Sequence, residues 1–135
     1  MKKVILILLV LVLAGAATGW YMYNKPVETL ESQEATVRFA AVDLFQKFSE
    51  NEAEAMKTYE GKVLEVTGNL IECMENSDGS TTLILDGGDP IFGIKCRLDP
   101  SVNSKAIPKA GEVVRLKGLC IGMNADVEMN QCIIL

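Results

Sequence analysis

Three successive patterns of hydrophobic and polar residues divide the chain. The first is an uncharged, almost entirely apolar run, Val4–Asn24, which follows Lys2 and Lys3. About 20 helical residues, each rising ~1.5 Å, are enough to cross the ~30 Å hydrocarbon core of a bilayer. Residues 1–24 are therefore predicted to form a transmembrane anchor or a signal segment.

The flanks of this segment indicate where the rest of the chain lies. Paired lysines before an apolar helix favour a cytoplasmic N-terminus, so the residues after the helix are expected to be exported. Ala14–Ala16 resembles a signal-peptide cleavage site, although the apolar character continues to Tyr23. We favour an anchor in the inner (cytoplasmic) membrane with an extracytoplasmic C-terminal domain. The alternative is a secreted or periplasmic domain after signal cleavage.

The second pattern has helical spacing. After a polar linker over residues 25–33, we expect a helical lead-in over residues 34–59 that packs on the domain behind it. Its first, amphipathic helix is expected to run from Glu34 to about Ser49, and a shorter one to cover Glu52–Tyr59. The apolar face of the first helix consists of Val37, Ala41, Leu44, Phe45 and Phe48.

The third pattern begins after Gly61 and alternates with a period of two, as half-buried strands do. Turn residues such as Asn76–Gly79 and Asp86–Pro90 separate the alternating segments. Between the third and fourth segments, Pro100–Ile107 is expected to form a short helix. Five strands are predicted: Val63–Leu70, Ser80–Leu85, Phe92–Leu98, Val113–Ile121 and Asp126–Ile134.

Five strands with a helix between the third and the fourth are the order of the OB fold, in which the fifth strand lies between the third and the fourth. Gly68, within the first strand, suits the sharp bend that a small barrel needs. The predicted fold class is therefore mainly β: a five-stranded OB-fold Greek-key barrel over residues 60–135. An amphipathic helix and the N-terminal transmembrane or signal helix precede it.

Several short segments of the barrel region form a recognisable set. They are Tyr59–Val63, Val66–Gly68, Gly93–Leu98, Gly111–Gly118, Leu119–Gly122 and Asp126–Cys132. Together, over about Ala40 to Leu135, they resemble the tRNA_anti-like family of exported bacterial OB-fold proteins, which are often labelled lipoproteins. The resemblance implies the fold and an exported domain, and it brings no established activity with it. This chain departs from a lipoprotein because no cysteine precedes Cys73, so a lipid-attachment cysteine is missing.

Charge and composition narrow the classes of function. The net charge is −5, and the chain has no histidine, the commonest general base and metal ligand. Residues 61–135 hold seven Lys and Arg against ten Asp and Glu, a net charge of −3. Domains that bind nucleic acid instead carry clustered basic residues. We therefore expect a protein that is not an enzyme and has no cofactor or metal, with nucleic acid as a disfavoured partner.

The outward faces of the predicted third and fourth strands carry basic residues. The candidate ligand-facing basic patch consists of Lys95, Arg97, Arg115 and Lys117. The alternative, which we favour, is that these are ordinary solvated strand faces. OB domains that bind single strands also offer stacking aromatic side chains. The barrel sequence has Phe92 alone, with Tyr59 at its edge.

All four cysteines, Cys73, Cys96, Cys120 and Cys132, follow the apolar segment. Because an exported domain enters an oxidising compartment, a disulfide is expected. The candidate bridge is Cys120–Cys132, across the final hairpin, although Cys132 would also reach Cys96 in the OB strand order. Strand parity weakens the first pairing, since Cys132 is out of phase with its strand unless a bulge intervenes. Buried free thiols are the alternative, and no C-x-x-C supports a redox or metal role.

The aspartates give no catalytic pattern. Asp78, Asp86 and Asp89 fit Asx turns better than a calcium loop, and Asp126 is expected to bond the backbone of the last hairpin turn. The leading hypothesis is a non-enzymatic binding or protein-interaction module of the bacterial cell envelope. Its N-terminal helix meets the membrane, and its partner is an unidentified envelope protein or small ligand. The alternatives are a nucleic-acid-binding OB domain and a thiol-active envelope protein.

Overall fold

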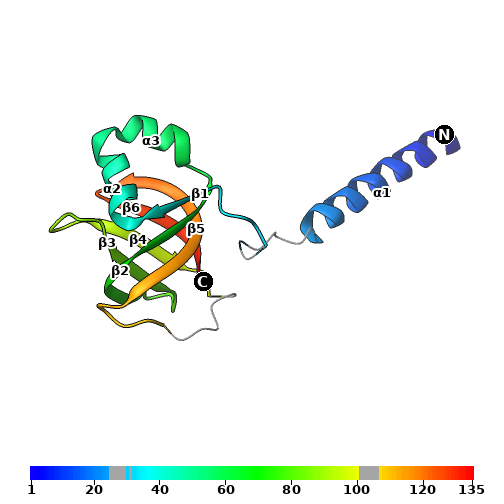
Figure 1. The fold of residues 1–135 in the computed structure, drawn as a ribbon. Coiled ribbons are helices and arrows are strands. Elements are labelled where there is room, and N and C mark those ends of the chain that lie inside the picture. Colours follow the sequence, from blue (N-terminus) through cyan, green and yellow to red (C-terminus); the bar gives the residue numbers. More distant parts are fainter. Residues whose placement is uncertain (25–29, 31, 101–106) are drawn as a thin grey trace.

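The computed structural model describes residues 1–24, 30, 32–100 and 107–135. The linker predicted over residues 25–33 and the helix predicted over Pro100–Ile107 lie largely outside these described residues. The first element, α1, spans Lys2–Asn24 and buries none of its residues (Figure 1). Of the helices in the described part of the chain, only α1 is long and apolar enough to cross a membrane. Membrane anchors and signal sequences share this property.

A closed β-barrel forms the body of the C-terminal region (Figure 1). With the short strand β1 (Val37–Ala40) at its edge, the sheet order is β1-β2-β3-β4-β6-β5, and a further pairing of β2 with β5 closes the barrel. The last strand of the chain thus lies between β4 and β5, as predicted, and the mainly β, OB-type fold class is confirmed. The barrel strands are β2 (Val63–Glu75), β3 (Thr81–Asp86), β4 (Gly93–Leu98), β5 (Val113–Asn124) and β6 (Asp126–Ile134).

The strands keep the inward–outward alternation that the sequence predicts. On β4, for example, Ile94 and Cys96 are fully buried whereas Arg97 is exposed. On β6 the alternation changes phase, because Gln131 adopts a positive φ of 52° and the register with β4 and β5 shifts beside it. This irregularity is the β-bulge that would bring Cys132 into phase with the core-facing residues, and Cys132 is fully buried.

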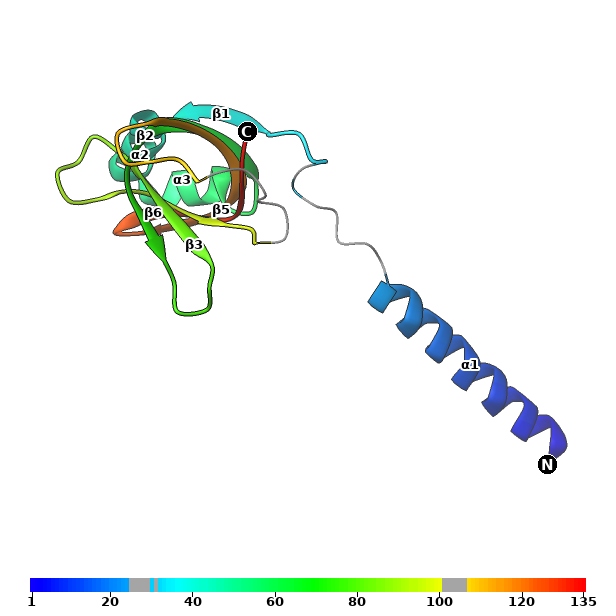
Figure 2. The same cartoon turned by 90° about the horizontal axis from the view of Figure 1, so that it is seen from below.

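The helical lead-in differs from its prediction at its start. Residues Val37–Ala40 form β1, a short strand that pairs in parallel with Leu64–Thr67 of β2, and Figure 2 shows β1 running along β2. The helix predicted from Glu34 therefore begins later, at Ala41. The prediction was wrong because Val37 fits a helical face and a strand alternation equally well, and only the contact with β2 decides between them.

Two helices, α2 (Ala41–Glu50) and α3 (Glu52–Tyr59), cover one end of the barrel (Figures 1 and 2). The apolar face of α2 lies in the core, where Leu44 and Phe48 are fully buried. The side chain of Asn51 accepts a hydrogen bond of 3.2 Å from the backbone N–H of Glu54, so it caps the N-terminus of α3. The second helix of the lead-in has the bounds that the sequence predicts.

The start of α2 touches the barrel at Gly68. A Cβ atom on Gly68 would lie only 2.6 Å from the Cβ of Ala41, well inside the ~3.5–4.0 Å of an ordinary carbon–carbon contact. Just beyond this glycine, β2 leaves β5 and pairs with β3. The glycine expected to allow a bend therefore also lets a helix approach the strand closely.

Candidate functional site

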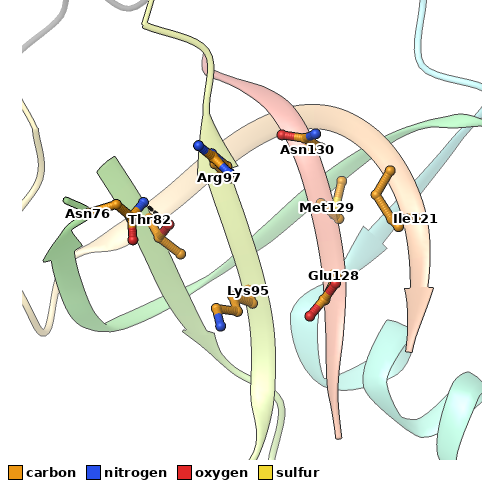
Figure 3. Close-up of a pocket in the computed structure, with 8 residues that line it drawn as sticks. All are labelled: Asn76, Thr82, Lys95, Arg97, Ile121, Glu128, Met129 and Asn130. Carbon is orange, nitrogen blue, oxygen red and sulfur yellow. Dashed lines mark hydrogen bonds between the residues drawn. The ribbon is translucent and has the colours of Figure 1, made fainter. Parts of the chain in front are cut away.

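A hollow in the barrel surface lies over β3, β4, β6 and the end of β5 (Figure 3). It has a volume of about 360 Å³. Figure 3 shows Lys95 and Arg97 one after the other along β4, between Thr82 on β3 and the β6 residues Glu128 and Asn130. We name this hollow the β4 groove. Its lining residues are Asn76, Thr82, Lys95, Arg97, Ile121, Glu128, Met129 and Asn130.

One wall of the β4 groove is a network of polar side chains at the β2–β3 hairpin. The amide of Asn76 donates to the hydroxyls of Thr82 and Ser80, each at 2.9 Å. Asp78 accepts from the backbone N–H and hydroxyl of Ser80 and pairs with Arg97. These hydrogen bonds from Ser80, with the charge of Arg97, hold the pKa of Asp78 below its ordinary value. The wall is therefore a fixed array of donors and acceptors.

The floor and the far wall join opposite charges to apolar surface. Lys95 on β4 is the direct register partner of Glu128 on β6. Within the described residues neither side chain makes an ion pair. Ile121 is 42% exposed at the far wall, and Met129 lies beneath. An ammonium, a carboxylate and an apolar side chain are thus available to one ligand.

A second hollow of about 350 Å³ continues the β4 groove past Arg97 and Asn130, which line both. It adds Asp78 and Asp99, so the charged residues lining the two hollows are two basic and three acidic. Gln131, the residue with the positive φ, also lines it. The side chains described around these hollows include no aromatic ring. The combined surface is polar, slightly acidic and without stacking platforms.

The structure separates the predicted basic patch into two parts. Lys95 and Arg97 lie together in the β4 groove. Arg115 instead pairs with Glu65 on β2, at 3.4 Å between Nε and Oε1. Lys117 is buried, and its ammonium donates to the backbone carbonyl of Gln33 at 2.6 Å. Alternation along a strand predicts which residues point outward, but outward directions diverge around a closed barrel.

None of the four cysteines forms a disulfide in this structure. The bridge predicted between Cys120 and Cys132 is not formed in this structure, where both residues are free thiols. Burial raises the pKa of Cys120 to about 11, with a smaller contribution from the charge of Glu60. A reactive thiol requires the opposite shift, so this environment does not favour thiol chemistry at Cys120.

The aspartates act on the backbone. The carboxylates of Asp78, Asp86 and Asp89 each accept N–H groups two or three residues ahead, which are the predicted Asx turns. Asp126 differs from its prediction: its carboxylate accepts a hydrogen bond of 2.8 Å from the backbone N–H of Gly93, and not from the hairpin turn. This bond joins the first residues of β4 and β6. No cluster of metal-binding side chains occurs among the described residues.

Sequence reasoning missed the β6 residues of the groove. Glu128 is the partner of Lys95, and Asn130 lines the groove with Arg97, only because β6 inserts beside β4 with a defined parallel register. The strand order was predicted, but the register depends on the Gly93–Asp126 hydrogen bond and the bulge at Gln131, which no alternation pattern encodes. A search for polar residues at outward positions of both strands would have found them.

Comparisons with known proteins agree with the barrel. Residues 1–133 match the model of the family described as tRNA_anti-like. Among curated proteins, no sequence matches the chain. A solved structure that it resembles is a lipoprotein of Klebsiella pneumoniae, named for an assumed ability to bind nucleic acid. The TM-score is 0.52 at 15% identity, over 75% of this chain and 92% of that one. A second is the yeast Stn1 and Ten1 structure, with a TM-score of 0.48 at 13% identity, over 77% of this chain and 64% of that one.

Proposed function

The chain belongs to the tRNA_anti-like family of OB-fold proteins, and on that premise we propose that it is a non-catalytic binding module of the bacterial cell envelope. Its α1 helix anchors the barrel to the cytoplasmic membrane, and the barrel lies outside the cytoplasm. The β4 groove holds its ligand. Fold alone does not define a function, so the proposal rests on this site.

The observation that carries the proposal is the position of the β4 groove. OB barrels hold oligonucleotides and oligosaccharides on the face of their second and third strands, beside the loops that follow strands one and four. In this chain those strands are β3 and β4, and the groove lies over them and reaches the β2–β3 hairpin. The β4 groove therefore lies on the face that the fold makes available for ligands.

The charges of the site favour an uncharged or zwitterionic polar ligand. Lys95 and Arg97 are offset by Glu128, Asp78 and Asp99, so a polyanion gains little net attraction. The exposed amide of Asn130 offers directed hydrogen bonds in the groove. An extended peptide or a glycan segment supplies the complementary donors and acceptors, and Ile121 supplies an apolar contact.

Nucleic acid is the second candidate. Lys95 and Arg97 support it, because both line the face on which OB barrels bind single strands. The Klebsiella structure similar to this chain carries a nucleic-acid-binding name. The acidic lining opposes it, as does the position of the aromatic residues: Phe92 lies in the β3–β4 loop and Tyr59 packs on Phe48 and Phe39.

The test is an NMR titration of the full chain in detergent micelles with three probes. The probes are a neutral ten-residue peptide, chitohexaose, and a ten-nucleotide single-stranded DNA at low salt. The groove variant is Ile121→Glu, which places a charge on the far wall. The matched control is Val113→Glu, an equally apolar and more exposed residue (69%) on the same strand but outside the groove.

We expect the peptide or the glycan to cause saturable shifts at groove residues that Ile121→Glu removes and Val113→Glu keeps. Saturable shifts with DNA alone, weakened steeply by salt, would establish the second candidate in place of the first. If no probe shifts the groove residues, or if the shifts lie elsewhere, the β4 groove is not the binding site for these ligand classes and the proposal fails.

A further inference from the structure

Two of the buried cysteines lie on neighbouring strands. Cys96 is on β4 and Cys132 is on β6, and these strands pair in parallel with Leu98 opposite Cys132. The bulge at Gln131 rotates Cys132 into the core, on the same side as Cys96. Both side chains are fully buried, with an exposed fraction of 0%. Cys132 is therefore one step along the ladder from Cys96, on the same face.

The two thiols are near enough to act on each other. The neighbouring thiol of Cys96 raises the pKa of Cys132 well above its ordinary value, and burial raises it further. Each sulfur also faces a backbone carbonyl of its own strand: Ile94 at 3.9 Å for Cys96, and Asn130 at 3.7 Å for Cys132. Both sulfurs lie in the barrel core, where a disulfide would join two unionised thiols.

The other cysteines lack such a neighbour. Cys120 on β5 is buried, but the ladder places Met129 between it and Cys96, and no cysteine is among the groups that shift its pKa. Cys73 is exposed on the β2–β3 hairpin, opposite Leu83. Among the four cysteines, the barrel thus brings Cys96 and Cys132 together.

We propose that Cys96 and Cys132 form a structural disulfide when the domain folds outside the cytoplasm, joining β4 to β6. The inference takes only export from the function proposed above and is independent of the ligand. Because both thiols are buried in the folded barrel, the reaction takes place during folding, before the strands close over them.

The oxidant is a protein or small-molecule disulfide of the oxidising compartment. The thiolate of one cysteine attacks the oxidant disulfide, forms a mixed disulfide and releases one oxidant sulfur as a thiolate. The thiolate of the other cysteine attacks the mixed disulfide at the sulfur of its partner and releases the second. Two thiols are oxidised to one disulfide, the oxidant is reduced to two thiols, and the two protons from the cysteines end on the oxidant.

The bond would lock the parallel pair of strands that carries most of the β4 groove. Lys95 and Arg97 flank Cys96 on one strand, while Glu128 and Asn130 precede Cys132 on the other. A covalent link behind these side chains fixes the register that brings them together. Reduction would therefore loosen the floor of the groove as well as the barrel.

The experiment counts free thiols in the full-length protein extracted from membranes in the presence of N-ethylmaleimide under denaturing conditions. Labelling of Cys73 in intact spheroplasts with a membrane-impermeant maleimide first reports whether the barrel is exported. The variants are Cys96→Ser, Cys132→Ser and, as a matched control that is equally buried, Cys120→Ser. Intact mass and peptide mapping identify the linked residues.

We expect an exported chain with two alkylated cysteines, Cys73 and Cys120, and a peptide link between Cys96 and Cys132. Cys120→Ser should keep the link, whereas Cys96→Ser and Cys132→Ser should lose it. Four alkylated thiols in a chain whose Cys73 is labelled from outside, or a link to Cys120, would overturn the inference and leave the binding proposal intact. An unlabelled Cys73 would overturn both the inference and the envelope location. The wild-type count holds even if a serine variant fails to fold.

Discussion

The close contact between α2 and β2 gives a sharp test of how the helices cover the barrel. The perturbation is Gly68→Ala, whose added methyl would lie 2.6 Å from the Cβ of Ala41. A contact about 1 Å too short forces backbone shifts, and overpacking of this kind costs about 1–3 kcal/mol of unfolding free energy. Because Ala41 is only 1% exposed, its methyl group has no solvent to move into.

The compensating change is Ala41→Gly, which removes the methyl that Gly68→Ala meets. Alone it costs about 1–2 kcal/mol, from one lost buried carbon and the low helix propensity of glycine. The double variant should cost no more than Ala41→Gly alone. The double-mutant cycle should therefore give a favourable coupling of about 1–3 kcal/mol.

The assay is urea unfolding of the full chain in detergent micelles, followed by near-ultraviolet circular dichroism. Ala53→Gly is the control partner, since it places a glycine at an exposed position of α3 that does not meet Gly68. It should add to Gly68→Ala without coupling. If Gly68→Ala is as stable as the wild type, or if it couples equally to both glycine variants, the close approach of α2 to β2 is refuted.

Three further changes test the rest of the barrel. Asp126→Ala leaves the N–H of Gly93 unpaired and should lower the unfolding free energy by about 1–3 kcal/mol. Asp126→Asn keeps an acceptor, so it should lower the unfolding free energy by less. Equal losses of the two variants in urea titrations would contradict this bond. Asn51→Ala removes the cap of α3 and should cost about 0.5–2 kcal/mol in the same titrations, and an unchanged midpoint would exclude the cap. Because burial raises the pKa of Cys120 from 9.0 to about 11, the unfolded thiol ionises first, so stability should fall as the pH rises from about 9 to 11. Melting curves of Cys120→Val should show a smaller fall over that range, and an identical fall would assign the effect to other groups.

The local alternation of apolar and polar residues determines most strands of the barrel, and these strands could be predicted. The apolar positions of β4 fall at every second residue, as do Val127 and Met129 on β6, and turn residues such as Asn76–Gly79 separate the strands. Five alternating segments with a gap after the third also imply the OB strand order. The fold class of the chain between Ala40 and Leu135 could therefore be predicted from the sequence.

What local alternation leaves undetermined depends on contacts between distant segments. Val37 fits either a helix or a strand until β2 pairs with it. Lys117 reads as a solvated lysine until its ammonium meets the carbonyl of Gln33. Arg97 and Arg115 share an outward parity, yet the curvature of a closed barrel directs one into the β4 groove and the other to Glu65. Identifying the β4 groove thus required the three-dimensional register, which separates the residues of the predicted basic patch.

The central claim is that the β4 groove is an occupied binding site in the cell envelope. The most direct measurement places a photo-crosslinking amino acid at Ile121 or at Val113 of the full chain in living cells. The first position lines the groove, and the second is an exposed apolar residue of the same strand outside it. We expect a discrete adduct from position 121 that added peptide or glycan weakens by competition, and no adduct from position 113. Equal adducts from both positions, or none from position 121, would contradict it.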